Sequence, residues 1–141
     1  MEKYPVRTVT FDYNIGDVCL RYQKLSTGQV YDALSESGLK GRAMKAGIYP
    51  LVPAMKLAGP AFTVHGEQTP NMDRVDVRLG MIGSMFEGCV QIRDSGGNVN
   101  AGHFGEVNAT AARSAGCTGA ILDGSTRDSS RLIEMDFPTF C

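Results

Sequence analysis

The second half of the chain alternates between two hydrophobic periodicities. Short apolar runs at 88–92 and 119–122 predict buried strands, and a further strand begins at 137–140. Between these runs, residues 104–115 and 126–135 have the apolar spacing of helices. The order strand, helix, strand, helix, strand is typical of an α/β fold, in which helices cover a largely parallel sheet.

The helix predicted over 104–115 carries small side chains along one face. Small residues let a helix pack closely against a sheet, so this face is expected to be buried. Its members are Ala109, Ala111, Ala112 and Ala115. Gly116 follows in the position where a glycine commonly ends a helix.

The first half of the chain predicts two short amphipathic helices. Ile15, Val18, Cys19 and Tyr22 follow a weak helical spacing. A second helix begins after the cap at 26–27, carries Val30 and Leu34, and ends at Gly38.

An extended connector at 49–53 separates these helices from the rest of the chain, because its prolines disfavour a helix. A strand is expected within 57–64, where Pro60 restricts it to a sheet edge or to its first residues. Residues 65–72 are expected to form a loop and 73–85 a helix. Residues 94–97 and the pair Asp123-Gly124 predict turns.

Length and composition narrow the class of protein. A chain of 141 residues with 43% apolar and 21% charged residues is expected to form a single domain, 1–141. A net charge of −1 and a pI near 6.1 exclude a global basic field for direct nucleic-acid binding. The four cysteines form no metal-binding pair, and neither an N-terminal apolar region nor a membrane-length run is present. These features predict a cytoplasmic protein that does not bind membranes.

Two polar motifs flank one predicted helix–strand unit. Gly105-Glu106-Val107-Asn108 places a glycine turn at a helix N-terminus, whose free N–H groups favour an anion. Arg127-Asp128 follows the strand at 119–122, and ligands of α/β sheets bind at the carboxyl ends of strands. We therefore expect the two motifs to converge.

The chemistry of these residues suggests a carboxylate site beside a divalent ion. Arg127 offers a planar fork for a carboxylate or a 2-oxo acid, and Asp128 offers a hard oxygen ligand for Mg²⁺ or Mn²⁺. Glu106 adds a carboxylate that can orient metal-bound water. A metal and an arginine beside a 2-oxo acid stabilise the enolate that C–C cleavage requires. All five lysines lie in the first 56 residues, so metal chemistry is a simpler interpretation than a Schiff base.

Structural interpretations of the same residues remain open. Arg127 and Asp128 are also compatible with a surface arginine and a helix-start acid, and Glu106 with a first-turn acid that serves the helix dipole. Asp123 and Asp94 are more typical of turn formers than of ligands, and His103 of a packed or solvated side chain.

Three segments resemble the RraA-like family, which includes 4-hydroxy-4-methyl-2-oxoglutarate/4-carboxy-4-hydroxy-2-oxoadipate aldolases and regulators of ribonuclease E activity. They are DALSESGLKG…GIYPLVPAMKLAGPAFTV, FGEVNATAARSAGCTGAILDGSTRD and FPTF, within about residues 26–140. The most specific block is 105–128, where an acidic residue, twenty intervening residues and Arg-Asp match the aldolase signature. The resemblance implies a swivelling β/β/α fold and a class II pyruvate aldolase, often with oxaloacetate decarboxylase activity.

The resemblance also implies residue roles. Arg127 would contact the pyruvyl group and Asp128 would hold the metal, while the N–H groups of Val107 and Asn108 would bind the carboxylate and Glu106 would sit in the water shell. A non-catalytic, protein-binding regulator of an RNA-degrading enzyme is the alternative. The implied assembly is a trimer or a dimer of trimers, with sites between subunits.

The chain departs from the family pattern in two places. Family members continue past Cys141 with later strands and a Pro-Gly-Asp turn, so the C-terminal part of the family fold is expected to be missing. The strand edge at 137–140 is then expected to be exposed unless another segment or subunit covers it. Residues 68–94 match the family loosely, and Asn71 is a candidate pocket residue only by that match.

Overall fold

The computed structural model describes residues 8–40, 43–66 and 74–141. Asn71 and most of the loop expected at 65–72 lie outside these ranges. Within the described residues, no helix is long and apolar enough to cross a membrane.

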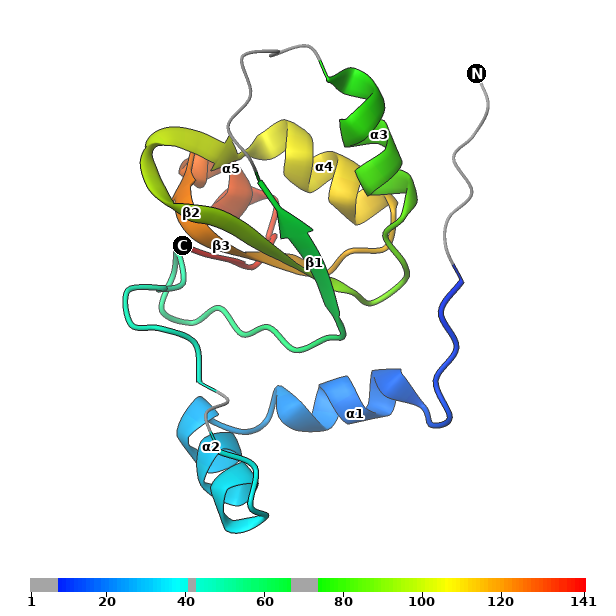
Figure 1. Cartoon of the computed structure of the whole chain (residues 1–141), viewed down its shortest axis with the longest axis vertical. Coiled ribbons are helices and arrows are strands. Elements are labelled where there is room, and N and C mark those ends of the chain that lie inside the picture. The colour runs from blue at the N-terminus through cyan, green and yellow to red at the C-terminus, as the bar shows by residue number, and fades with distance from the viewer. Residues whose placement is uncertain (1–7, 41–42, 67–73) are drawn as a thin grey trace.

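A four-stranded sheet forms the centre of the molecule, and all its strands run parallel in the order β1-β2-β3-β4 (Figure 1). The strands are β1 (Ala61–His65), β2 (Val90–Phe104), β3 (Gly119–Thr126) and β4 (Thr139–Phe140). The helices that connect them are α3 (Val75–Gly83), α4 (Glu106–Ser114) and α5 (Ser129–Glu134). The predicted strand–helix alternation and the parallel, helix-covered sheet are therefore confirmed. β1 begins directly after Pro60 and lies at the sheet edge, as the proline requires.

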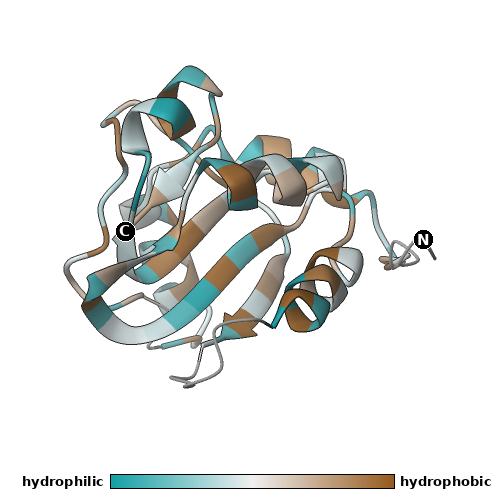
Figure 2. Ribbon diagram, turned by 90° about the horizontal axis from the view of Figure 1, so that it is seen from above, coloured by the Kyte–Doolittle hydropathy of each residue, from teal (hydrophilic) through white to brown (hydrophobic). Residues whose placement is uncertain are grey.

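The core lies between the sheet and these helices. Ala109 and Ala112 of α4 are almost completely buried, so the predicted small-residue face does pack against the sheet. Phe104 and Phe137 stack beside them with ring centroids 6.0 Å apart. In Figure 2, hydrophobic segments recur along the strands at the centre of the molecule. Gly116 ends this helix region with a φ of 88°, which matches its predicted role as the residue after the helix.

Two predicted turns lie inside strands, and the corresponding predictions are wrong. β2 continues through 94–97 to Phe104, and β3 continues through Asp123-Gly124 to Thr126. The register between β2 and β3 shifts three times beyond Asp94. Bulges of this kind place glycine and asparagine inside a paired strand, so a local turn signal does not mark the end of the strand.

Two helices precede the sheet: α1 (Ile15–Tyr22) and α2 (Thr27–Glu36). The predicted cap of α2 is confirmed, because Ser26 and Gln29 form a reciprocal capping box. Figure 1 shows α1 and α2 apart from α3 and α4, below the sheet in that view. Neither helix contains a buried residue, so their apolar faces contribute little to the core.

The edge of β4 is covered, which corrects the expectation of an exposed strand edge at 137–140. Tyr49 and Cys141 exchange two backbone hydrogen bonds of 3.0 and 2.9 Å, and Leu51 N–H donates to Thr139 O at 3.0 Å. The predicted extended connector therefore lies antiparallel along β4. Phe137 is 1% exposed. An unpaired edge at this place is thus no argument for an oligomer.

Candidate functional site

Arg127 and Asp128 lie directly after β3, as predicted, at the carboxyl edge of the sheet. Arg127 N–H donates to Phe104 O at 2.8 Å, which ties this motif to the end of β2. Asp128 has a left-handed backbone (φ 57°), a conformation that aspartate tolerates better than most residues. Both side chains remain accessible, with exposed fractions of 66% and 41%.

The carboxylate of Asp128 connects the two predicted motifs. Its Oδ2 accepts a hydrogen bond from Glu106 N–H at 3.3 Å and lies 3.7 Å from Arg127 Nε. Asp128 precedes α5 but makes no side-chain cap there, so its carboxylate serves the first turn of α4 instead. The predicted convergence of the turn at 105–108 with Arg127-Asp128 is therefore present.

Gly105 makes this close approach possible. It is buried, and a Cβ at this position would lie 2.5 Å from Asp128 Oδ2 and 2.8 Å from Arg127 Cγ. Its φ of −168° is extended, so any residue could adopt the backbone. Glycine is therefore required here because a Cβ has no room beside Asp128 and Arg127, and not because of the backbone conformation.

The N-terminal turn of α4 supplies the expected N–H donors. Val107 and Asn108 occupy the first turn, where helix geometry leaves N–H groups without an intrahelical partner. The side chain of Val107 is 73% exposed, which leaves this end of the helix open to solvent. The positive end of the helix dipole adds to the attraction for an anion.

Glu106 has a partner that the sequence did not indicate. Arg131 Nη2 of α5 lies 2.9 Å from Glu106 Oε1. The hydrogen bond and charge of Arg131 lower the pKa of the Glu106 carboxyl. Glu106 is therefore an ionised acceptor at neutral pH, and one of its oxygens is already engaged.

The oxygen donors of this region fit a hydrated metal ion and do not fit a site closed by protein ligands alone. Within 8–40, 43–66 and 74–141, no three His, Cys, Asp or Glu side chains are grouped so that they could hold a metal ion. A closed protein cage is thus not formed by these residues. Mg²⁺ commonly binds through one or two carboxylates while it keeps several waters. The accessible carboxylate of Asp128, with the ionised Glu106 nearby, fits a hydrated ion of that type.

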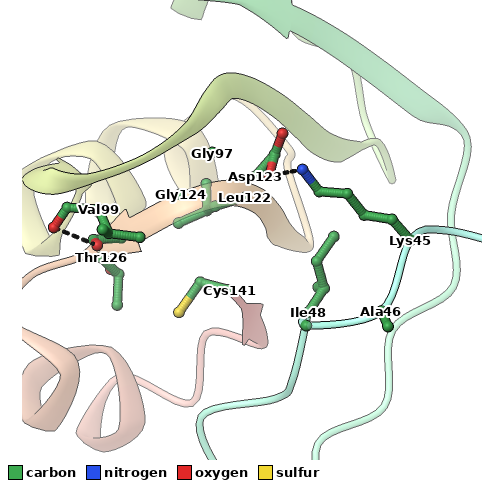
Figure 3. Close-up of a pocket in the computed structure, with 12 residues that line it drawn as sticks. Lys45, Ala46, Ile48, Gly97, Val99, Leu122, Asp123, Gly124, Thr126 and Cys141 are labelled. Atoms are coloured by element: carbon green, nitrogen blue, oxygen red, sulfur yellow. Dashed lines mark hydrogen bonds and ion pairs between the residues drawn. The ribbon is translucent and has the colours of Figure 1, made fainter.

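A separate cavity of about 520 Å³ lies beside the carboxyl end of β3 (Figure 3). Lys45 Nζ lies 2.7 Å from Asp123 Oδ1 at this cavity, so folding does bring one N-terminal lysine to the sheet. The lysine side chain is 63% exposed and ion-paired. These surroundings differ from the buried, apolar environment of a Schiff-base lysine.

Sequence patterns missed Arg131 and Lys45 because their partners are distant along the chain. Arg131 lies 25 residues from Glu106, on a helix whose first turn follows Asp128. A third missed residue is Arg93, a half-buried cation on β2. The signal in the sequence that could have drawn attention to Arg93 is its place directly after the apolar run 88–92.

Comparison with known proteins agrees with this architecture. No curated protein matches the sequence. A solved structure described as a novel cellulase from microbes associated with the gut ecosystem shares 26% identity, with a TM-score of 0.78 over 95% of this chain and 61% of its own. An uncharacterised protein from Pseudomonas syringae pv. tomato also shares 26% identity, with a TM-score of 0.69 over 89% of this chain and 56% of its own.

RraAS2 from Streptomyces coelicolor shares 24% identity, with a TM-score of 0.75 over 94% of this chain and 65% of its own. It is described as an unusual member of the RNase ES inhibitor RraA protein family. At that identity the likeness concerns the fold alone. The chain thus spans less than two thirds of each of these three structures. A family model described as Aldolase/RraA matches residues 27–141, and the chain therefore belongs to the RraA-like family.

Proposed function

We propose that the chain binds a small 2-oxo acid between the first turn of α4 and Arg127-Asp128, and that it acts as a divalent-metal-dependent pyruvate aldolase. Oxaloacetate decarboxylation is the accompanying activity. The observation that carries the proposal is the contact of Asp128 Oδ2 with Glu106 N–H at 3.3 Å, because it brings an arginine, a carboxylate and a helix N-terminus together. Each has the chemistry that a 2-oxo acid and a hydrated cation require.

Each residue has a separate task in this proposal. Arg127 binds the 2-oxo acid through its guanidinium fork, and its side chain is 66% exposed. The N–H groups of Val107 and Asn108 bind the substrate carboxylate. Glu106 orients an ordered water by accepting a hydrogen bond from it, a task that suits a carboxylate whose pKa is lowered by Arg131 and that stays ionised.

Asp128 is the residue that would hold Mg²⁺ or Mn²⁺. When bound, the ion supplies Lewis-acid polarisation of the 2-oxo group. Asp128 also accepts from Glu106 N–H, so the same carboxylate keeps the binding turn beside the arginine.

A protein-binding regulator is the second candidate. The exposed apolar side chains of α1 and α2 favour it, since Leu20 is 59% exposed and Tyr22 and Tyr31 are each 46% exposed. Exposed apolar side chains gathered on consecutive helices are typical of protein interfaces. The same faces would also serve as subunit contacts in the trimer or hexamer that the family resemblance implies.

Pyruvate release from oxaloacetate tests the proposal. Wild type should release pyruvate with Mg²⁺ and lose that activity in excess EDTA. Asp128→Asn should abolish metal-dependent turnover. Asp136→Asn is the matched control, because Asp136 also has a left-handed backbone (φ 49°) and asparagine tolerates it equally well. Equal turnover of the two variants, or full wild-type activity in EDTA, contradicts the proposed site.

A further inference from the structure

Arg93 lies on β2 and bonds to the segment that leads into α4. Its Nη1 donates to the backbone carbonyl of His103 at 2.7 Å, and its Nη2 lies 3.4 Å from Met81 Sδ of α3. His103 precedes Gly105, the residue that caps α4, by two positions. The guanidinium therefore holds the backbone two residues before the turn that carries the proposed carboxylate donors.

The charge of Arg93 is not neutralised by a neighbouring carboxylate in the described ranges. Burial lowers the pKa of its guanidinium. Its Nε is buried and has no hydrogen-bond partner among the described residues. Arg93 is half-buried, and a buried Nε without a partner is costly, so an arginine at this place needs a reason beyond packing.

The segment that Arg93 holds is connected to Arg127 on its other side. Phe104 O accepts from Arg127 N–H at 2.8 Å and from Thr126 Oγ1 at 2.9 Å. His103 Nε2 lies 3.1 Å from Asn98 O and donates to that carbonyl. Residues 103 and 104, at the end of β2, are thus held by Arg93 and Asn98 of the same strand and by Thr126 and Arg127 at the end of β3.

We propose that Arg93 is a positioning residue for the carboxylate-binding turn of α4. Its bond to His103 O sets the path of Phe104 and Gly105, and its uncompensated charge favours an anion at the adjacent turn. This role rests on the proposed function, since it concerns the binding of the same substrate carboxylate. It concerns ligand binding, and Arg93 itself does not touch the reacting atoms.

The test compares Arg93→Met with Arg113→Met in the full chain. Arg113 is a matched control because its Nη2 also donates to backbone carbonyls, those of Met135 and Asp136 at 2.6 and 2.8 Å, but near the opposite end of α4. Pyruvate with Mg²⁺ is the probe, and the amide NMR shifts of Val107 and Asn108 report its Kd. Thermal unfolding reports the stability of each variant.

Both variants should lower the Tm, and Arg93→Met alone should weaken pyruvate binding, by about tenfold for one hydrogen bond to a charged group. With oxaloacetate, its KM should rise while kcat stays within twofold. Arg93→Lys keeps the charge without the fork and should lie between wild type and Arg93→Met, and it serves as the second variant if methionine prevents folding.

Three results overturn the role of Arg93. The first is a pyruvate Kd for Arg93→Met within twofold of wild type, and the second is an equal loss of affinity in Arg113→Met. The third is the absence of any shift at Val107 and Asn108 in wild type. A wild-type protein that binds pyruvate but does not turn over oxaloacetate contradicts the aldolase proposal. In that case the comparison of pyruvate Kd values still decides the role of Arg93.

Discussion

Replacing Gly105 with alanine is the sharpest test of the site geometry. The added Cβ would lie 2.5 Å from Asp128 Oδ2, 2.8 Å from Arg127 Cγ and 3.3 Å from Arg127 Nε. The backbone is extended at this position, so the substitution introduces no conformational strain and acts by volume alone. Asp128 and Arg127 must both move away, and the hydrogen bond from Glu106 N–H to Asp128 is lost.

The expected cost of this overpacking is about 1–3 kcal/mol of unfolding free energy. For a chain of this length, each kcal/mol corresponds to about 2–4 °C in Tm. Oxaloacetate turnover should fall much further than stability, because the two displaced side chains are those proposed to bind the substrate and the metal.

Gly80→Ala is the matched control for Gly105→Ala. Gly80 lies within α3, and a Cβ there meets no atom within 4 Å among the described residues. Alanine at this position should stabilise the helix by about 0.5–1 kcal/mol and leave turnover unchanged. Urea unfolding and pyruvate release measure both effects. A Gly105→Ala chain with wild-type stability and turnover would show that Gly105 does not lie against Arg127 and Asp128.

Four further outcomes are expected. EDTA should abolish oxaloacetate turnover and Mg²⁺ or Mn²⁺ should restore it, whereas Asp128→Ala should lose turnover and metal dependence together while circular dichroism shows a retained fold. Arg127→Lys should lower kcat/KM by about 2–4 kcal/mol of transition-state stabilisation, and a variant within twofold of wild type makes Arg127 structural. Arg131→Met should raise the pKa of Glu106 towards its ordinary value in an NMR titration. The folded-state pKa of Glu106 is lowered, so this ion pair stabilises the fold above the unfolded-state pKa of Glu106. That stabilisation is lost as the pH falls through the folded-state pKa. A Glu106 pKa that Arg131→Met leaves unchanged contradicts the ion pair. Light scattering should show a trimer or hexamer, and a stable, active monomer refutes that assembly.

Local chemistry made several parts of the fold predictable. The capping box of Ser26 and Gln29 involves residues three apart, and the buried face of α4 follows from alanines at helical spacing. The joint placement of Glu106 and Asp128 was also predictable, because a parallel sheet brings the ends of its strands to one edge. In each case the determining contacts are short in sequence or follow from topology.

The course of β2 was not predictable, and it explains most of what sequence patterns missed. Gly96 and Gly97 have φ values of 64° and 68°, which is the local chemistry of a turn, yet the strand resumes pairing with β3 at Asn98. That pairing depends on a strand more than twenty residues away, which no local pattern reports. The same is true of Lys45, whose partner Asp123 lies on β3.

The irregular part of β2 is also what assembles the candidate site. A regular strand that ended at the predicted turn would leave Arg127 without its backbone partner at Phe104. The resumed strand instead carries Gly102 against Arg127, where a Cβ would lie 2.9 Å from the arginine Cβ, and then delivers Gly105 to Asp128. Gly102 on β2 and Gly105 directly after it thus let the chain pass along the whole Arg127-Asp128 motif. Alanine at Gly102 should therefore impair turnover through Arg127 alone while the hydrogen bond between Asp128 and Glu106 persists, and an amide shift of Glu106 equal to that caused by Gly105→Ala would contradict this division.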